Sequence, residues 1–240
     1  MARTGFVELP GAPPIAILYE DRSVLVVDKP RGWLLVPSSW RRTGRNLQAA
    51  ITSSIAAGDF WACSRGLKFL RFVHRLDAET SGLLLFAKSR GAIEAYSELL
   101  ESGRMEKTYL AVVVGTPKEV EWRCCLKLAQ DPQRLGRMRV DGRHGKEAET
   151  HFRLVQTRAG RSLLEVRPLT GRTHQIRVHL AASGWRVVGD ALYGRADDGC
   201  ELGLRAVRLA YVDPFTGRRV AIQAPVEVFC HEYGFDIPKV

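Results

Sequence analysis

The stretch from Phe72 to Leu85, FVHRLDAETSGLLL, decides how this chain is interpreted. Polar residues that favour turns, Asp77 among them, stand directly before an apolar run that predicts a buried strand over 83–87. A carboxylate on a loop at the mouth of a sheet is well placed for chemistry. The pattern alone leaves two interpretations open, a plain turn and a functional loop centred on Asp77.

A second polar segment, Arg167 to Leu180, reads RPLTGRTHQIRVHL. Its glycine turn opens a predicted helix over 173–183, with Thr173 as the N-cap, and N–H groups at a helix start favour anions such as phosphate. Basic or polar side chains occupy the first turns of this helix: Arg172, His174, Gln175 and Arg177. A solvated basic face is the alternative to a phosphate-binding one. A metal site built on His174 and His179 is disfavoured, because an i, i+5 spacing points the two rings to different sides of a helix.

Two further segments have the composition of a nucleic-acid surface. In the predicted strand over 108–114, Tyr109 serves either core packing or stacking on an unpaired base. The stretch 127–146 concentrates positive charge at Lys127, Arg134, Arg137, Arg139, Arg143 and Lys146. This stretch is either a solvated loop or an electrostatic contact with RNA.

The composition describes a folded, basic protein. Of the 240 residues 45% are apolar, and the formal charge of +10 favours polyanionic partners. The five cysteines are odd in number and form no C-x-x-C pair, which predicts reduced thiols and a cytoplasmic location. The longest apolar run, Tyr109 to Val114, is far below the roughly 20 residues that cross a bilayer. We therefore expect a protein that is neither exported nor embedded in a membrane.

The pattern of apolar residues predicts a single α+β domain over 15–240, preceded by a flexible, proline-rich lead-in at 1–14. Strands are expected at 23–28, 33–36 (as an antiparallel return), 83–87, 108–114, 147–155, 162–167, 207–211 and 219–223, and helices at 46–57, 91–101 and 173–183. Strands outnumber helices and do not alternate with them strictly. This favours a mixed, mainly antiparallel sheet.

At these segments the chain resembles the RluA-type pseudouridine synthase family, over about 17–225. The motifs that carry the resemblance are VLVVDKPRGW (24–33), HRLD (74–77) with TSGL (80–83), KTYLA (107–111), GKEAET (145–150), TGRTHQIRVHL (170–180) and GDALYG (189–194). No single motif is specific, but their shared order and spacing are.

The resemblance implies a bent sheet flanked by helices, with a catalytic cleft across it. It implies an enzyme without cofactor or metal, which isomerises a uridine to pseudouridine in structured RNA, either ribosomal RNA (most of all the large subunit) or tRNA. Asp77 matches the family's catalytic aspartate, Tyr109 the tyrosine that packs on the target base, and Arg177 the arginine that pairs with the aspartate. Arg75 matches an arginine that engages RNA when the uridine is flipped out.

We expect four further side chains to bind RNA: Arg172, His174, Gln175 and Lys146. The chain departs from many relatives in two features. It has no room for a small RNA-binding domain before the catalytic one, and its loop at 37–45 lacks the His-Pro and glycine-rich stretch of those relatives. With no obvious interaction helix, a monomer is expected. The main alternative is a non-catalytic RNA-binding protein that keeps the fold, which would not need Asp77, Tyr109 and Arg177 together. A hydrolase of small nucleosides is disfavoured, because a free nucleoside offers no phosphate to so basic a protein.

Overall fold

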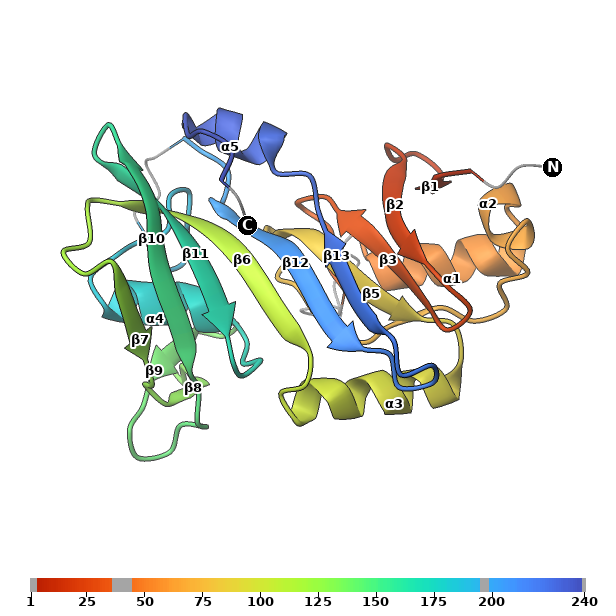
Figure 1. Cartoon of the computed structure of the whole chain (residues 1–240), viewed down its shortest axis with the longest axis horizontal. Helices are drawn as coiled ribbons and strands as arrows, with labels where there is room; N and C mark the ends of the chain where they lie inside the picture. The colour runs from red at the N-terminus through yellow and green to blue at the C-terminus, as the bar shows by residue number, and fades with distance from the viewer. Residues whose placement is uncertain (1–3, 36–44, 195–198, 239–240) are drawn as a thin grey trace. The chain divides into compact units, whose positions relative to one another are not determined.

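The computed structural model describes residues 4–35, 45–194 and 199–238 (Figure 1). The chain forms two compact units. The first unit combines Met1–Met105 with Leu209–Ala224, and the second combines Glu106–Arg208 with Pro225–Val240. Strand β12 (Leu204–Val212) supplies residues to both units. Within the described ranges, no helix has the length and apolar character that a membrane span requires.

The first unit is built on an antiparallel sheet with the strand order β1-β2-β3-β5. The strands are β1 (Phe6–Val7), β2 (Ile15–Glu20), β3 (Val24–Lys29) and β5 (Ser81–Ala87), with β4 (Arg71–Phe72) on β5 and β13 (Arg219–Gln223) on β12. Its helices are α1 (Leu47–Ala57), α2 (Phe60–Cys63) and α3 (Arg90–Glu101). All seven residues of β5 are buried, which explains why its sequence is continuously apolar instead of alternating.

Short polar side chains set the starts of α1 and α3 in this unit. The Asn46 side chain accepts a hydrogen bond from the Ala49 N–H at 2.9 Å and begins α1, and Ser89 caps α3 in the same way. Gly58 ends α1 with a φ of 76°, a conformation that costs glycine little. The helices predicted at 46–57 and 91–101 are therefore confirmed to within a residue at each end.

The second unit contains the antiparallel strand order β6-β11-β10-β7. Its strands are β6 (Glu106–Val114), β7 (Glu121–Cys124), β10 (Thr150–Arg158) and β11 (Arg161–Pro168), while β8 (Leu128–Gln130) and β9 (Met138–Val140) pair with each other. Its helices are α4 (Gln175–Ala182) and α5 (Glu227–Tyr233). Leu110 and Val112 of β6 pack in one buried cluster with Phe229 and Cys230 of α5.

The predicted α+β class with a mainly antiparallel sheet is confirmed, and three local predictions are corrected. Instead of a returning strand at 33–36, the described residues form an isolated parallel bridge between Leu34 and Asn46. The N-cap of α4 is His174, not Thr173. Part of the expected lead-in at 1–14 is structured, since β1 pairs with β2 and Val7 is fully buried. The single-domain assignment stays a prediction.

Candidate active site

Asp77 lies in the loop that joins β4 to β5 in the first unit. Its side chain is half-buried, between the exposed Arg75 and a turn in which the Thr80 N–H donates to the Asp77 carbonyl at 3.2 Å. Leu76 is buried beneath the loop, with 6% of its surface exposed. One apolar residue thus anchors the loop, while its polar neighbours face outward or remain partly accessible.

Lys29, at the end of β3, holds this loop from below. Its side chain is fully buried, and its ammonium donates to the carbonyls of Ala78 (2.8 Å), Thr80 (2.9 Å) and Pro30 (3.1 Å). Burial lowers the pKa of Lys29 to about 8, against the opposing charges of Glu79 and Asp77. Three backbone carbonyls thereby satisfy the buried ammonium, which would otherwise be very costly to desolvate.

The sequence analysis assigned Lys29 only to a turn and missed this role. A signal was present, because the lysine closes an apolar strand (VLVVDK), and residues at alternate positions of a strand share a face. Val27, two residues earlier, is 1% exposed, so position 29 points to the same buried side.

His74 secures the other side of the loop. Its Nε2 accepts from the Leu85 N–H at 3.2 Å, and the Val73 N–H donates to the Leu85 carbonyl at 2.9 Å. The approach to Asp77 is therefore fixed to β5 on one side, and the exit through Thr80 is fixed to Lys29 on the other.

In the second unit, Arg177 of α4 is buried and forms a two-pronged ion pair with Asp190. Its Nε lies 2.8 Å from Oδ2 and its Nη2 lies 2.7 Å from Oδ1. Burial raises the pKa of the Asp190 carboxyl, but the Arg177 hydrogen bonds and charge, with the N–H groups of Tyr193 and Leu192, bring it below its ordinary value. Asp190 therefore orients Arg177. The predicted pairing of Arg177 with Asp77 stays a prediction.

Tyr193, in the same GDALYG motif, is a second residue whose role sequence reasoning missed. Its hydroxyl accepts from the Met138 N–H at 2.8 Å and lies 2.9 Å from Nδ1 of His174. The guanidinium groups of Arg177 and Arg137 lie over its ring, 5.3 and 5.2 Å from the centroid. Tyr193 thus joins α4 to the β8–β9 hairpin that carries the basic stretch.

Gln175 has a structural role inside the second unit, and its predicted RNA contact stays a prediction. It is 4% exposed, and its oxygen accepts from Thr170 Oγ1 (2.7 Å) and the Arg172 N–H (2.9 Å). Its amide nitrogen donates to the Glu149 carbonyl and Thr150 Oγ1, both at 2.9 Å. Since an amide offers two acceptor and two donor positions, all four are used inside the unit. Gln175 therefore fixes the turn that presents Arg172.

The other predicted RNA-binding residues lie on the second unit's surface or near it. Arg172 is exposed and donates from Nε to the Glu147 carbonyl at 2.9 Å, and Lys146 is exposed. His174 is half-buried and takes a left-handed φ of 54° at the start of α4. Tyr109, on β6, is 8% exposed. The loop at 37–45 lies outside the described residues except for Arg45.

His179 belongs to the core. Its ring is fully buried, with Nδ1 2.9 Å from Thr150 Oγ1 and Nε2 2.9 Å from the Leu126 carbonyl, and burial lowers its pKa. Both ring nitrogens are therefore committed to protein partners. Over the described ranges, no three side chains of the metal-binding types converge. All five cysteines are free thiols.

Comparisons with known proteins agree with this fold and these motifs. The family model described as RNA pseudouridylate synthase matches residues 23–182. Ribosomal large subunit pseudouridine synthase C of Escherichia coli (strain K12) is 34% identical over 230 residues, covering 88% of this chain and 66% of that protein. The protein of the same name from Buchnera aphidicola is 31% identical over 233 residues, covering 90% of this chain and 69% of the relative. The chain thus belongs to the RNA pseudouridylate synthase family, as its motifs predicted, and spans about two thirds of these relatives.

Solved structures support the same fold. Human RNA pseudouridylate synthase domain containing 1 superposes with a TM-score of 0.70 at 27% identity, over 88% of this chain and 83% of that one. Human RNA pseudouridylate synthase domain containing 4 gives 0.73 at 19% identity, over 93% and 94% of the two chains. The second match bears on the fold alone.

Proposed function

We propose that this protein isomerises specific uridines to pseudouridine in ribosomal RNA, with Asp77 as the essential catalytic carboxylate. The observation that carries the proposal is the clamped loop around Asp77 in a chain of this family. Relatives named ribosomal large subunit pseudouridine synthases support ribosomal RNA over tRNA as the substrate. We place the enzyme in the cytoplasm, in keeping with its free thiols, and the expected monomer stays a prediction.

The reaction breaks the bond from ribose C1′ to uracil N1, turns the base and joins C1′ to C5. The proton leaves C5 and N1 gains one, so the sum of atoms and electrons is unchanged and no redox cofactor is needed. Glycosidic bond chemistry commonly depends on a carboxylate, and we assign that role to Asp77. Attack on the base, attack on the sugar and removal of a sugar proton all require the same group.

Tyr109 and Arg177 complete the proposed catalytic set. Tyr109 is assigned to packing on the target base, and Arg177, oriented by Asp190, supplies a fixed positive charge. Arg75, exposed beside Asp77, is assigned to RNA engagement when the uridine is flipped out. Arg172, His174 and Lys146 are assigned to phosphate or base contacts.

Pseudouridine mapping tests this proposal. Ribosomal RNA and tRNA transcripts are treated with the wild type, Asp77→Asn or Glu79→Gln, then labelled with carbodiimide and reverse transcribed. Glu79 is an exposed carboxylate two residues away, so its variant controls for lost charge on the same loop. We expect a position-specific stop in ribosomal RNA with the wild type and Glu79→Gln, and none with Asp77→Asn. A wild type that binds RNA but yields no stop would instead indicate a non-catalytic RNA-binding protein.

A further inference from the structure

A cavity in the first unit lies apart from the Asp77 loop. It has a volume of about 460 Å³ and is lined by Glu20, Asp21, Arg22, Arg65, Gly66, Leu67, Lys68 and Lys88. Three segments meet there: the turn between β2 and β3, the chain that follows α2, and the end of β5. Four of the lining residues are cationic and two are acidic, an excess of two positive charges.

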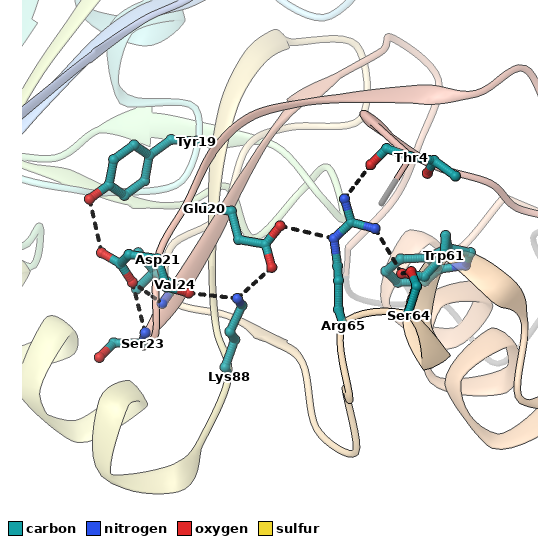
Figure 2. Close-up of polar contacts among 10 residues, drawn as sticks. All are labelled: Thr4, Tyr19, Glu20, Asp21, Ser23, Val24, Trp61, Ser64, Arg65 and Lys88. Atoms are coloured by element: carbon teal, nitrogen blue, oxygen red, sulfur yellow. Dashed lines mark hydrogen bonds and ion pairs between the residues drawn. The ribbon is translucent and has the colours of Figure 1, made fainter. Parts of the chain in front are cut away.

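The carboxylates of Glu20 and Asp21 both bind partners from the same part of the first unit (Figure 2). Glu20 lies between Arg65 Nε (2.9 Å) and Lys88 Nζ (2.7 Å), and although burial raises its pKa, these two cations bring it below its ordinary value. Asp21 accepts from the Ser23 and Val24 N–H groups at 2.7 and 2.8 Å and from the Tyr19 hydroxyl at 3.0 Å. Glu20 is thus paired with two cations, whereas Asp21, whose side-chain partners are neutral, keeps its negative charge in the lining.

The cations divide into a fixed floor and an open rim. Arg65 is held by Glu20, the Trp61 carbonyl and the Thr4 carbonyl, and only 3% of its side chain is exposed. Lys88 uses two of its three N–H groups, on Glu20 and on the Asp21 carbonyl at 2.6 Å. Arg22 and Lys68 line the cavity with exposed side chains, and in the described part of the chain neither has a hydrogen-bond or ion-pair partner.

We propose that this cavity binds a backbone phosphate of the RNA substrate, with Arg22 and Lys68 as its ligands and the third N–H of Lys88 beneath them. The inference rests on the proposed function for the identity of the polyanion. Its physical basis is that neither rim side chain has an ion-pair partner among the described residues, whereas the Glu20 carboxylate and the Asp21 backbone carbonyl hold the floor cations in place. The Asp21 turn fixes the backbone on either side of Arg22, so less order must be imposed when a phosphate binds.

The length of strand β3 gives the separation between this cavity and the Asp77 loop, where the target nucleotide is proposed to bind. Val24 stands at the cavity end of the strand and Lys29 at the Asp77 end. Five steps at roughly 3.3 Å each place the two ends about 17 Å apart, which is about five nucleotide steps of 3.4 Å. The cavity would therefore contact RNA well outside the flipped uridine and favour substrates that are folded over the enzyme.

The test compares two double variants with the same loss of charge. Arg22→Gln with Lys68→Gln removes the rim, and Lys118→Gln with Arg218→Gln removes two exposed cations elsewhere. The dissociation constant for a substrate transcript is measured from 50 to 300 mM KCl, and pseudouridine formation at saturating enzyme is followed on the same samples.

For the rim variant we expect binding about tenfold weaker near 100 mM salt and a slope of log Kd against log salt reduced by about 0.7, for the one phosphate contact that is lost. The rate constant at saturation should stay unchanged. Equal affinity and slope in the two double variants would overturn the inference while leaving the proposed function intact. If no RNA is modified but the rim slope still falls, the phosphate site stands and the proposed catalysis fails.

Discussion

Replacing Lys29 with methionine tests whether the buried ammonium positions the catalytic loop. Methionine keeps a long apolar stem in a site that is fully buried, but it removes every N–H donor. The carbonyls of Pro30 and Thr80 then lose the donor they have now, whereas the Ala78 carbonyl still accepts from the Gly32 N–H at 2.9 Å. The change therefore loosens the chain on the exit side of Asp77.

Two opposing terms set the effect on stability. Each orphaned buried carbonyl costs about 1–3 kcal/mol, hence about 2–6 kcal/mol for two. Against this, the variant no longer buries the Lys29 ammonium, whose pKa burial lowers from 10.5 to about 8. Removing that group raises the unfolding free energy by about 3 kcal/mol. We expect the unfolding free energy to change by between a gain of about 1 kcal/mol and a loss of about 3 kcal/mol, so the variant folds.

The effect on catalysis should be much larger, because a displacement of about 1 Å in a reacting group costs about a hundredfold in rate. Single-turnover pseudouridine formation at saturating enzyme gives the rate constant, RNA affinity is measured by filter binding, and urea titration gives the stability. We expect a rate constant reduced about a hundredfold with the Kd for RNA within about twofold. Lys118→Met, at an exposed lysine, is the matched control. A Lys29→Met enzyme with the wild-type rate would refute the positioning role.

Three further predictions concern stability and are read by urea titration. Between pH 8 and 10.5 the unfolding free energy of the wild type should rise by up to about 3 kcal/mol more than that of Lys29→Met. In this window folded Lys29, with its pKa of about 8, has released its proton, whereas the unfolded chain still holds it. Asp190→Asn should cost about 3 kcal/mol at pH 7, because it removes the charge from a buried, two-pronged ion pair with Arg177. The lowered pKa of Asp190 means that this stabilisation is complete above the ordinary value of 3.8 and is lost as the pH falls below it. The exposed control Glu98→Gln should show neither effect. Gly189→Ala should cost more than Gly103→Ala, since both glycines have φ near +70° (71° and 70°) but a Cβ at 189 would overlap a backbone carbonyl while 103 faces open space; equal losses would show that backbone strain alone matters.

Elements with a local signal were predictable from the sequence. The strand at 219–223 was predicted with the bounds that β13 has, because the Asp213 turn marks one side of it. The buried strand over 83–87 and the helix at 46–57 carry their own apolar pattern or cap. For these elements the local sequence and the tertiary packing favour the same structure, so local reasoning suffices.

Elements that depend on partners were missed. Strands β8 and β9 have three residues each and exist because they pair with each other, and β1 has two residues that pair with β2. Leu34 reads as a strand residue by composition but forms a lone bridge. The composition of one short segment does not decide such cases, because each segment is held by hydrogen bonds to a second nearby segment and by the turn between them.

The site illustrates the same limit for side chains. A polar residue in a motif is equally consistent with meeting a ligand and with holding its neighbours, and only the count of satisfied donors and acceptors separates the two. The motif suggests that Gln175 contacts RNA, which stays a prediction, and the structure shows that all four of its hydrogen-bonding positions are used within the second unit. Lys29 and Asp190 were given no role, yet one clamps the loop of Asp77 and the other orients Arg177.

This division of the motifs into buried holders and more accessible functional residues has a measurable consequence. Asp77 and Arg75 retain access to solvent, whereas Lys29, Gln175 and Asp190 are at most 4% exposed. A conservative substitution of the exposed Arg75 should change affinity or rate without changing the urea midpoint, because an exposed side chain contributes little to the buried core. Substitutions of the three holders should shift the midpoint and the rate together. If Arg75→Gln were to shift the urea midpoint as much as Asp190→Asn does, Arg75 would itself be a holder, and its assignment to RNA engagement would lose its structural basis.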